Sequence, residues 1–178
     1  MKVFGCLLLL LPGVIIGHAG QPEASFTLES VGARIGLSAF NSGPEFHQVD
    51  ATAVANLPWK FDLEKACTMQ SVANMAFGWL GDPGHDAFVT SAGPGLMFAH
   101  GDFPFKLEGG LAPTFISRAD FGSKDLGTRF QFTSHIGLLM DMGPRLRVSY
   151  RFQHMSNGGF AYPNPGLNLH MIGVSYHF

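Results

Sequence analysis

The alternation of apolar and polar residues near the C-terminus restricts the fold of this chain more than any other feature. From Arg145 to Gln153, the even positions after Arg145 are apolar, and the odd ones are Arg, Ser or Gln. A turn-rich break follows, and the even positions from Ile172 to Phe178 are apolar again. Residues two apart lie on the same face of a β-strand. The stretch therefore predicts a β-hairpin in which each strand has one apolar face.

Alternation of the same kind recurs upstream and predicts six more strands, over residues 31–40, 49–61, 71–80, 87–100, 105–116 and 128–140. The strand over 87–100 contains Gly93-Pro94-Gly95. Because proline cannot donate a ladder hydrogen bond, we expect this strand to bend. Charged and small residues share the opposite face, as they do inside small barrels. The predicted fold class is all-β, an eight-stranded antiparallel transmembrane β-barrel, closed so that no strand edge is left unpaired.

Composition also favours a membrane barrel. The chain of 178 residues has 23 Gly, 17 Phe and only 13% charged residues. Lys2, an apolar run over 3–16 and then Gly17-His18-Ala19 form the pattern of a secretory signal peptide. We expect residues 1–19 to be this signal peptide and residues 20–178 to form a barrel in a Gram-negative outer membrane. No later apolar run is long enough for a membrane-spanning helix, and the net charge of -2 favours no nucleic-acid partner.

Two reactive side chains continue the apolar parity of the hairpin's first strand. His154 and Ser156 are at even positions, so they share the face that a membrane barrel turns to lipid. A serine hydroxyl becomes a good nucleophile only beside a base, and an ionisable residue on a lipid-facing surface is costly without a function. The pair therefore predicts an esterase site, with His154 as the base and Ser156 as the nucleophile.

Neighbouring residues can supply the remaining parts of such a site. Asn168 has the same parity on the second strand and could orient the imidazole through its side-chain oxygen. Asn157 and the backbone of Gly158 or Gly159 follow the nucleophile directly and are suitable donors to an oxyanion. If both ends of the barrel are periplasmic, the loop that follows Ser156 is extracellular. The site then lies in the outer leaflet, where lipid A carries its ester-linked acyl chains.

These features together resemble the lipid A 3-O-deacylase family, also called acyloxyacyl hydrolase. The resemblance covers the signal peptide, the short strands and the aromatic C-terminus, and its specific part is the RFQHMSN segment with the NPGLN turn. It implies that His154 and Ser156 belong to a catalytic triad and that Asn157 and Gly159 build the oxyanion hole. The family has an acidic residue where this chain has Asn168, so the orienting group here is neutral. An unrelated and larger barrel, the outer-membrane phospholipase A, is similar in using His, Ser and Asn.

The activity implied is that of a serine esterase that hydrolyses the 3-position acyl ester of lipid A, the lipid part of lipopolysaccharide, without a metal or an organic cofactor. His85-Asp86 follows a turn and has no repeated ligand spacing, which indicates loop polar groups rather than a metal site. Two alternatives remain: a phospholipase that acts on glycerophospholipids, and a structural barrel with an inactive site. The sequence also leaves open whether two copies form a homodimer.

Overall fold

The computed structural model describes residues 26–39, 45–63, 66–101, 103–122 and 124–178. These contain eight strands: β1 Thr27–Ser38, β2 His47–Leu63, β3 Cys67–Asp82, β4 His85–His100, β5 Phe105–Ile116, β6 Phe130–Asp141, β7 Leu146–Ser156 and β8 Leu167–His177. The predicted signal peptide, residues 1–19, lies outside the described residues. Among the residues described, no helix has the length and apolar character needed to cross a membrane.

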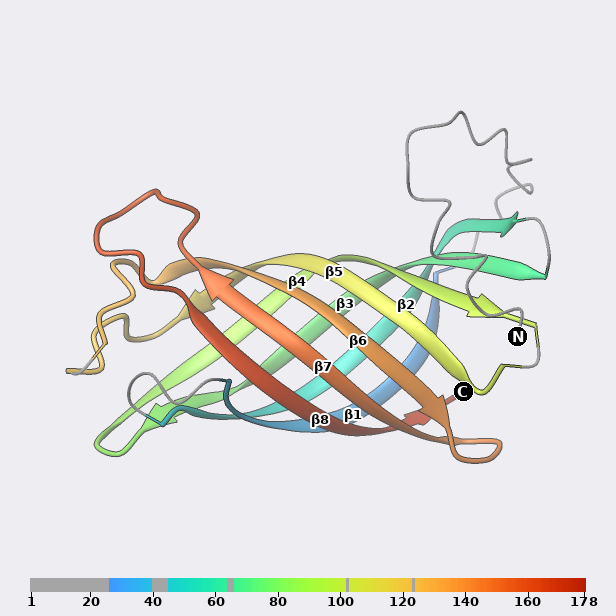
Figure 1. Cartoon of the computed structure of the whole chain (residues 1–178), viewed down its shortest axis with the longest axis horizontal. Helices are drawn as coiled ribbons and strands as arrows, with labels where there is room; N and C mark the ends of the chain where they lie inside the picture. The colour runs from blue at the N-terminus through green and yellow to red at the C-terminus, as the bar shows by residue number, and fades with distance from the viewer. Residues whose placement is uncertain (1–25, 40–44, 64–65, 102, 123) are drawn as a thin grey trace.

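The strands pair in chain order and close into an antiparallel barrel, as Figure 1 shows. Closure is made by β1 and β8, which pair from Ser30 opposite His177 to Ser38 opposite Leu169. β1 begins and β8 ends at one end of the barrel, and the loops that join β5 to β6 and β7 to β8 lie at the other end (Figure 1). The predicted fold class is confirmed.

Several strands extend beyond the apolar alternation that predicted them. β2 begins at His47 and β3 ends at Asp82, because the backbone ladder continues through polar positions. The Gly93-Pro94-Gly95 segment stays inside β4, where Pro94 lies opposite Ala73 of β3. On the other side of β4, the pairs with β5 stop at Ser91 and resume at Gly95. The pairing is thus interrupted on one side of β4 only, around the residue that has no N–H to donate. The predicted bend of this strand stays a prediction.

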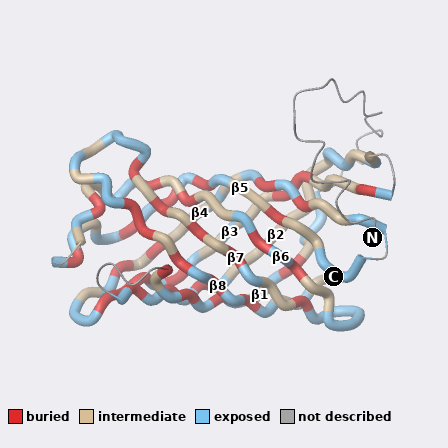
Figure 2. The backbone as a smooth tube through the Cα atoms, in the orientation of Figure 1, coloured by how far each residue is buried: buried red, intermediate tan, exposed pale blue. Residues whose placement is uncertain are grey.

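The two faces of the barrel wall differ in chemistry, and exposure alternates along part of each strand (Figure 2), most regularly along β8. Every strand contributes large apolar side chains to the exposed outer face. On β7 and β8 these are the even positions, as the sequence predicts: Leu146, Tyr150, Ile172, Val174 and Tyr176. A continuous apolar exterior of this kind is the surface that transmembrane barrels turn to lipid.

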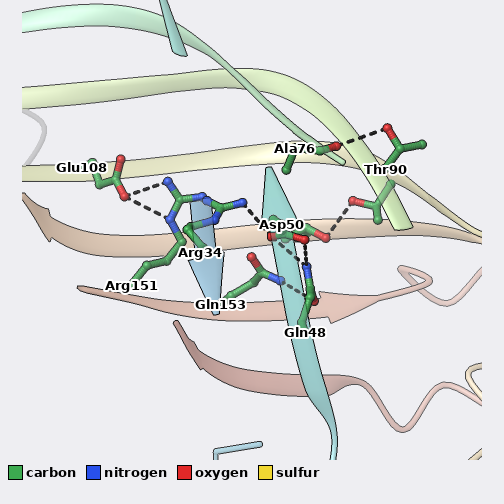
Figure 3. Close-up of polar contacts among 10 residues, drawn as sticks. Arg34, Gln48, Asp50, Ala76, Thr90, Glu108, Arg151 and Gln153 are labelled. Carbon is green, nitrogen blue, oxygen red and sulfur yellow. Dashed lines mark hydrogen bonds and ion pairs between the residues drawn. The ribbon is translucent and has the colours of Figure 1, made fainter. Parts of the chain in front are cut away.

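The inner face has a buried polar network that cross-links the strands (Figure 3). Arg151 of β7 donates to one oxygen of Glu108 on β5 through Nε at 3.0 Å and through Nη2 at 2.7 Å. Gln153 of β7 donates to Gln48 of β2 at 3.4 Å, and Gln48 in turn donates to both carboxylate oxygens of Asp50, at 2.9 and 3.0 Å. Because buried charges are tolerated only when they are paired, this network fixes β7 from inside the barrel.

Removing the terminal aromatic residue should impair assembly of the barrel. The ring of Phe178 lies 5.0 Å from that of Tyr176, and its N–H donates to the carbonyl oxygen of Glu29 on β1 at 3.1 Å. Phe178 therefore contributes to the closing seam as well as to an aromatic surface suited to the membrane interface. We expect deletion of Phe178 to lower the amount of folded, heat-modifiable barrel in isolated membranes, whereas Phe178→Tyr keeps it. Normal amounts without Phe178 would contradict this role.

Candidate active site

His154 and Asn168 face each other across the last two strands. They are a directly opposed pair of β7 and β8, and both are half-buried. The distance from His154 Nδ1 to Asn168 Oδ1 is 2.7 Å. An amide oxygen can only accept, so His154 Nδ1–H donates this hydrogen bond and Nε2 keeps a free lone pair. The pair therefore holds the imidazole in the tautomer in which Nε2 can act as a base.

Ser156 is the last residue of β7 and lies two residues beyond His154, on the same outward face. Its neighbour across the ladder is Phe132 of β6. In the described part of the chain, the hydrogen bond of the His154 ring is the one to Asn168, and none joins it to the Ser156 hydroxyl. Catalytic hydrogen bonds are often long in the absence of substrate and tighten when it binds. The structure thus places the predicted nucleophile and the predicted base on one face of one strand.

The inner side of the same strands is packed. Met155 lies between the two reactive residues, and Leu167 and Leu169 flank Asn168; all three are at most 3% exposed. They belong to a core cluster at the loop end of the barrel that also contains Phe46, Phe121 and Leu126. Close packing leaves such side chains little freedom to move. This core therefore keeps the intervening His154, Ser156 and Asn168 turned outward.

Asn157 is fully buried and ties the β7–β8 loop to the β5–β6 loop. Its side-chain oxygen accepts the N–H of Gly159 at 2.9 Å, and its own N–H donates to Asn164 Oδ1 at 3.1 Å. Its side-chain NH₂ lies 3.0 to 3.1 Å from three carbonyl oxygens, those of Leu126, Ala161 and Pro163. Asn157 and Gly159, which the resemblance assigns to the oxyanion hole, therefore lie within three residues of Ser156, and their N–H groups are bonded inside the loop.

An apolar surface adjoins Ser156, and the sequence did not identify it as part of the site. Phe132, the neighbour of Ser156, has its ring 5.2 Å from that of Phe130 and 5.9 Å from that of Phe160. Gly158, with φ of +65°, lies close over Phe132. The outward parity of Phe130 and Phe132 could have been read from the alternation, but Phe160 lies in a loop where no period applies. Such a surface favours contact with an apolar chain beside Ser156.

Gly166 packs against the imidazole of His154. It has φ of +62°, and a Cβ added there would lie 2.9 Å from His154 Cε1. Its carbonyl oxygen accepts a hydrogen bond from Lys124 Nζ at 3.0 Å, across 42 residues of sequence. Neither residue was among the predicted site residues, because a contact between two loops leaves no periodic signal in the sequence.

The site lies outside the lumen. Polar side chains that include Arg34, Glu108 and His135 line the interior cavity, whereas His154, Ser156 and Asn168 do not. Within the described ranges, no three His, Cys, Asp or Glu residues are grouped as a metal site requires. His85, for which the sequence indicates a loop polar group rather than a metal ligand, has its Nδ1 3.1 Å from Asp82 Oδ1.

Comparison with known proteins finds a protein family that matches most of this chain. A family model described as lipid A 3-O-deacylase (PagL) matches residues 47–177. The chain is 38% identical over 96 residues to the lipid A deacylase PagL of Bordetella bronchiseptica. That match covers 54% of this chain and 53% of the relative, so it spans about half the length of the curated protein.

One solved structure supports the fold. The crystal structure of the outer membrane enzyme PagL is similar with a TM-score of 0.66 at 16% identity, over 81% of this chain and 97% of that one. The backbone structure of the Yersinia pestis outer membrane protein Ail is more distant, with a TM-score of 0.45 at 12% identity over 83% of this chain and 99% of that one.

Proposed function

The chain belongs to the lipid A 3-O-deacylase (PagL) family, and from this we propose that it is an outer-membrane serine esterase that hydrolyses the 3-position acyl ester of lipid A. One observation carries the proposal: on the outer wall, His154 Nδ1 is 2.7 Å from Asn168 Oδ1, on the strand that ends at Ser156. A base in the correct tautomer, two residues before a serine on a lipid-facing wall, has the arrangement that ester hydrolysis of a membrane lipid needs.

In the proposed reaction, His154 Nε2 takes the proton of Ser156 Oγ while this oxygen attacks the ester carbonyl. The resulting imidazolium, which stays bonded to Asn168 through Nδ1–H, then gives the proton to the leaving 3-oxygen of the sugar. The fatty acid remains as an ester on Ser156. A water molecule, deprotonated in the same way by His154, hydrolyses this acyl-enzyme and restores the serine.

Asn157 and Gly159 remain the proposed oxyanion residues. The developing negative charge needs N–H donors that point at it. The N–H of Gly159 is bonded to Asn157 Oδ1, and the N–H of Asn157 is bonded to Asn164, so these bonds must be exchanged for bonds to substrate. Gly158 lies between them. We propose that the main chain over 157–159 forms the hole and that the Asn157 side chain holds this segment in shape.

The position of the site along the barrel agrees with a substrate in the outer leaflet. Ser156 lies at the loop end of β7, opposite the end at which β8 finishes (Figure 1). If the chain ends are periplasmic, as in bacterial outer-membrane barrels, this end is extracellular. The acyl chain would lie along the outer wall against Phe130 and Phe132. No step requires a metal ion or an organic cofactor.

Mass spectrometry of lipid A tests the substrate. Cells that express the chain should contain lipid A that lacks one ester-linked acyl chain, and cells that express Ser156→Ala should not. Unchanged lipid A masses in the presence of folded wild-type barrel would support an inactive structural barrel instead. A phospholipase is the second candidate, because the amide of Asn168 stands where the family has an acid. Release of fatty acid from glycerophospholipids but not from lipid A would favour that candidate.

Gly166→Ala should slow hydrolysis while leaving the barrel folded. The added methyl group would lie 2.9 Å from His154 Cε1, at a residue whose φ of +62° already disfavours a side chain. A shift of the catalytic group by about 1 Å can cost roughly 10²-fold in rate. We expect kcat on lipid A to fall by about 10- to 100-fold, while the variant barrel stays heat-modifiable and therefore folded. Gly143→Ala is the control, because Gly143 also has positive φ and nothing lies within 4 Å of an added Cβ.

A further inference from the structure

Lys124 brings a positive charge close to the catalytic base. It lies in the loop between β5 and β6, and its Nζ donates to the carbonyl oxygen of Gly166 at 3.0 Å. Gly166 in turn packs against His154, with its added-Cβ position 2.9 Å from the imidazole Cε1. Gly166 therefore contacts both the ammonium group of Lys124 and the imidazole of His154.

In the part of the chain that the structure describes, no carboxylate is paired with this charge. Among the described residues, none of the ion pairs within 4.0 Å includes Lys124. The two acids of its own loop are turned to the backbone: Asp120 accepts the N–H of Gly122 at 2.8 Å, and Asp125 accepts the N–H of Gly127 at 2.8 Å. An ammonium group has three donors, and the hydrogen bond to Gly166 uses one of them.

The surroundings of Lys124 favour an anionic partner. Burial lowers the pKa of the Lys124 ammonium group from its ordinary value, because desolvation penalises the charged form. An anion bound beside it would act in the opposite direction and stabilise the ammonium. Removing water also strengthens a hydrogen bond between two charged groups. A half-buried cation that forms no ion pair with any described residue, at the loop end of the barrel, is therefore suited to bind an anionic group of the substrate.

We propose that Lys124 is a specificity residue that binds the phosphate group on the glucosamine ring whose 3-ester is cleaved. The inference rests on the proposed function. Lipid A is a phosphorylated glucosamine disaccharide, so the scissile ester and a phosphate can belong to one sugar ring. When the ester carbonyl is at Ser156, the sugar lies next to His154 and Gly166, within reach of Lys124. The apolar surface of Phe130, Phe132 and Phe160 then contacts the acyl chain, and the positively charged Lys124 binds the phosphate of the head group.

The alternative role for Lys124 is structural, since its hydrogen bond to Gly166 also joins two loops. Three substitutions separate charge from hydrogen bonding. Lys124→Arg keeps both, Lys124→Gln keeps a donor for the Gly166 carbonyl but removes the charge, and Lys124→Met removes both. Arg118→Gln removes one positive charge from the same loop at an exposed position, and is the matched control for the overall charge of the loop.

The test compares kcat/KM for lipid A that has its phosphates and for the same lipid A after enzymatic dephosphorylation, in one detergent. Wild-type protein should prefer the phosphorylated lipid by about 10- to 100-fold, the range expected for a charge-assisted hydrogen bond. Lys124→Gln and Lys124→Met should lose this preference by slowing on the phosphorylated lipid alone. Lys124→Arg and Arg118→Gln should keep most of it.

Three results would overturn the inference. One is a wild-type enzyme that treats the two lipids alike. The second is an equal loss on both lipids in Lys124→Gln, which would assign Lys124 to loop structure. The third is an unchanged preference in Lys124→Gln. If folded wild-type protein hydrolyses neither lipid, the proposed function itself fails and the inference fails with it, and that result differs from the other three. The wild-type comparison needs no variant, so poor folding of a variant leaves the test intact.

Discussion

Ser156→Ala should reduce kcat on lipid A to the background of the assay. Without the hydroxyl there is no nucleophile for the first step, and removal of the nucleophile from a serine hydrolase costs on the order of 10⁶-fold in kcat. His154→Ala should cost about as much, since the serine then has no base, and the double variant should be no slower than either single one, because the two act as a unit. Both side chains lie on the outer wall and are half-buried, so the barrel should still be heat-modifiable.

A second serine gives this experiment a matched control. Ser134 of β6 lies directly opposite His154 in the ladder and is also half-buried. Ser134 is therefore also a neighbour of His154, but it lies inside a strand, whereas Ser156 is the last residue of its strand. Ser134→Ala should hydrolyse lipid A at close to the wild-type rate. If instead Ser134→Ala is inactive and Ser156→Ala is active, the nucleophile is Ser134 and the assignment of Ser156 is wrong.

The sequence predicts the barrel well because side chains alternate between the two faces of a β-strand, so the lipid-facing and inward-facing residues repeat every two positions. In β7 the apolar parity runs directly into His154. In β8 the even positions are apolar only from Ile172 on, and Asn168 shares their outward face by the spacing of two residues alone. Parity could not predict that the two residues lie directly opposite each other, because a strand register shifted by two residues keeps every side chain on the same face. The register is set by the length and the packing of the loop from 157 to 166.

Loop contacts account for the rest of what the sequence did not predict. The Asn157 side chain reaches carbonyls of two loops, and Lys124 reaches Gly166 across 42 residues. Such contacts depend on how irregular segments fold against one another, and no local pattern encodes them. The sequence identified Asn157 by its place after the nucleophile, but it could not predict that every N–H of this residue would be used to hold the loop.

Asn168→Ala should also slow hydrolysis strongly, because Asn168 fixes the tautomer of the base. The bond from His154 Nδ1–H to Asn168 Oδ1 leaves Nε2 free to accept a proton; without it, the ring can rotate or carry its proton on Nε2. A base that is positioned and protonated correctly contributes about 10² to 10⁴-fold to rate, so we expect kcat on lipid A to fall within that range. Unchanged turnover would mean that Asn168 serves only the turn that precedes it.

Asn168→Asp completes this test, since it keeps the acceptor oxygen in place and adds a charge. The carboxylate should attract the imidazolium that forms in the transition state, and the attraction is stronger at a half-buried lipid boundary than in water. We expect Asn168→Asp to turn over at least as fast as wild type, and Asn168→Glu, which places the acid one methylene further out, to keep activity as well. If Asn168→Asp and Asn168→Glu are as slow as Asn168→Ala, the neutral amide is required at this position. The triad of this chain would then differ from the acidic triad of the family in working only with an amide.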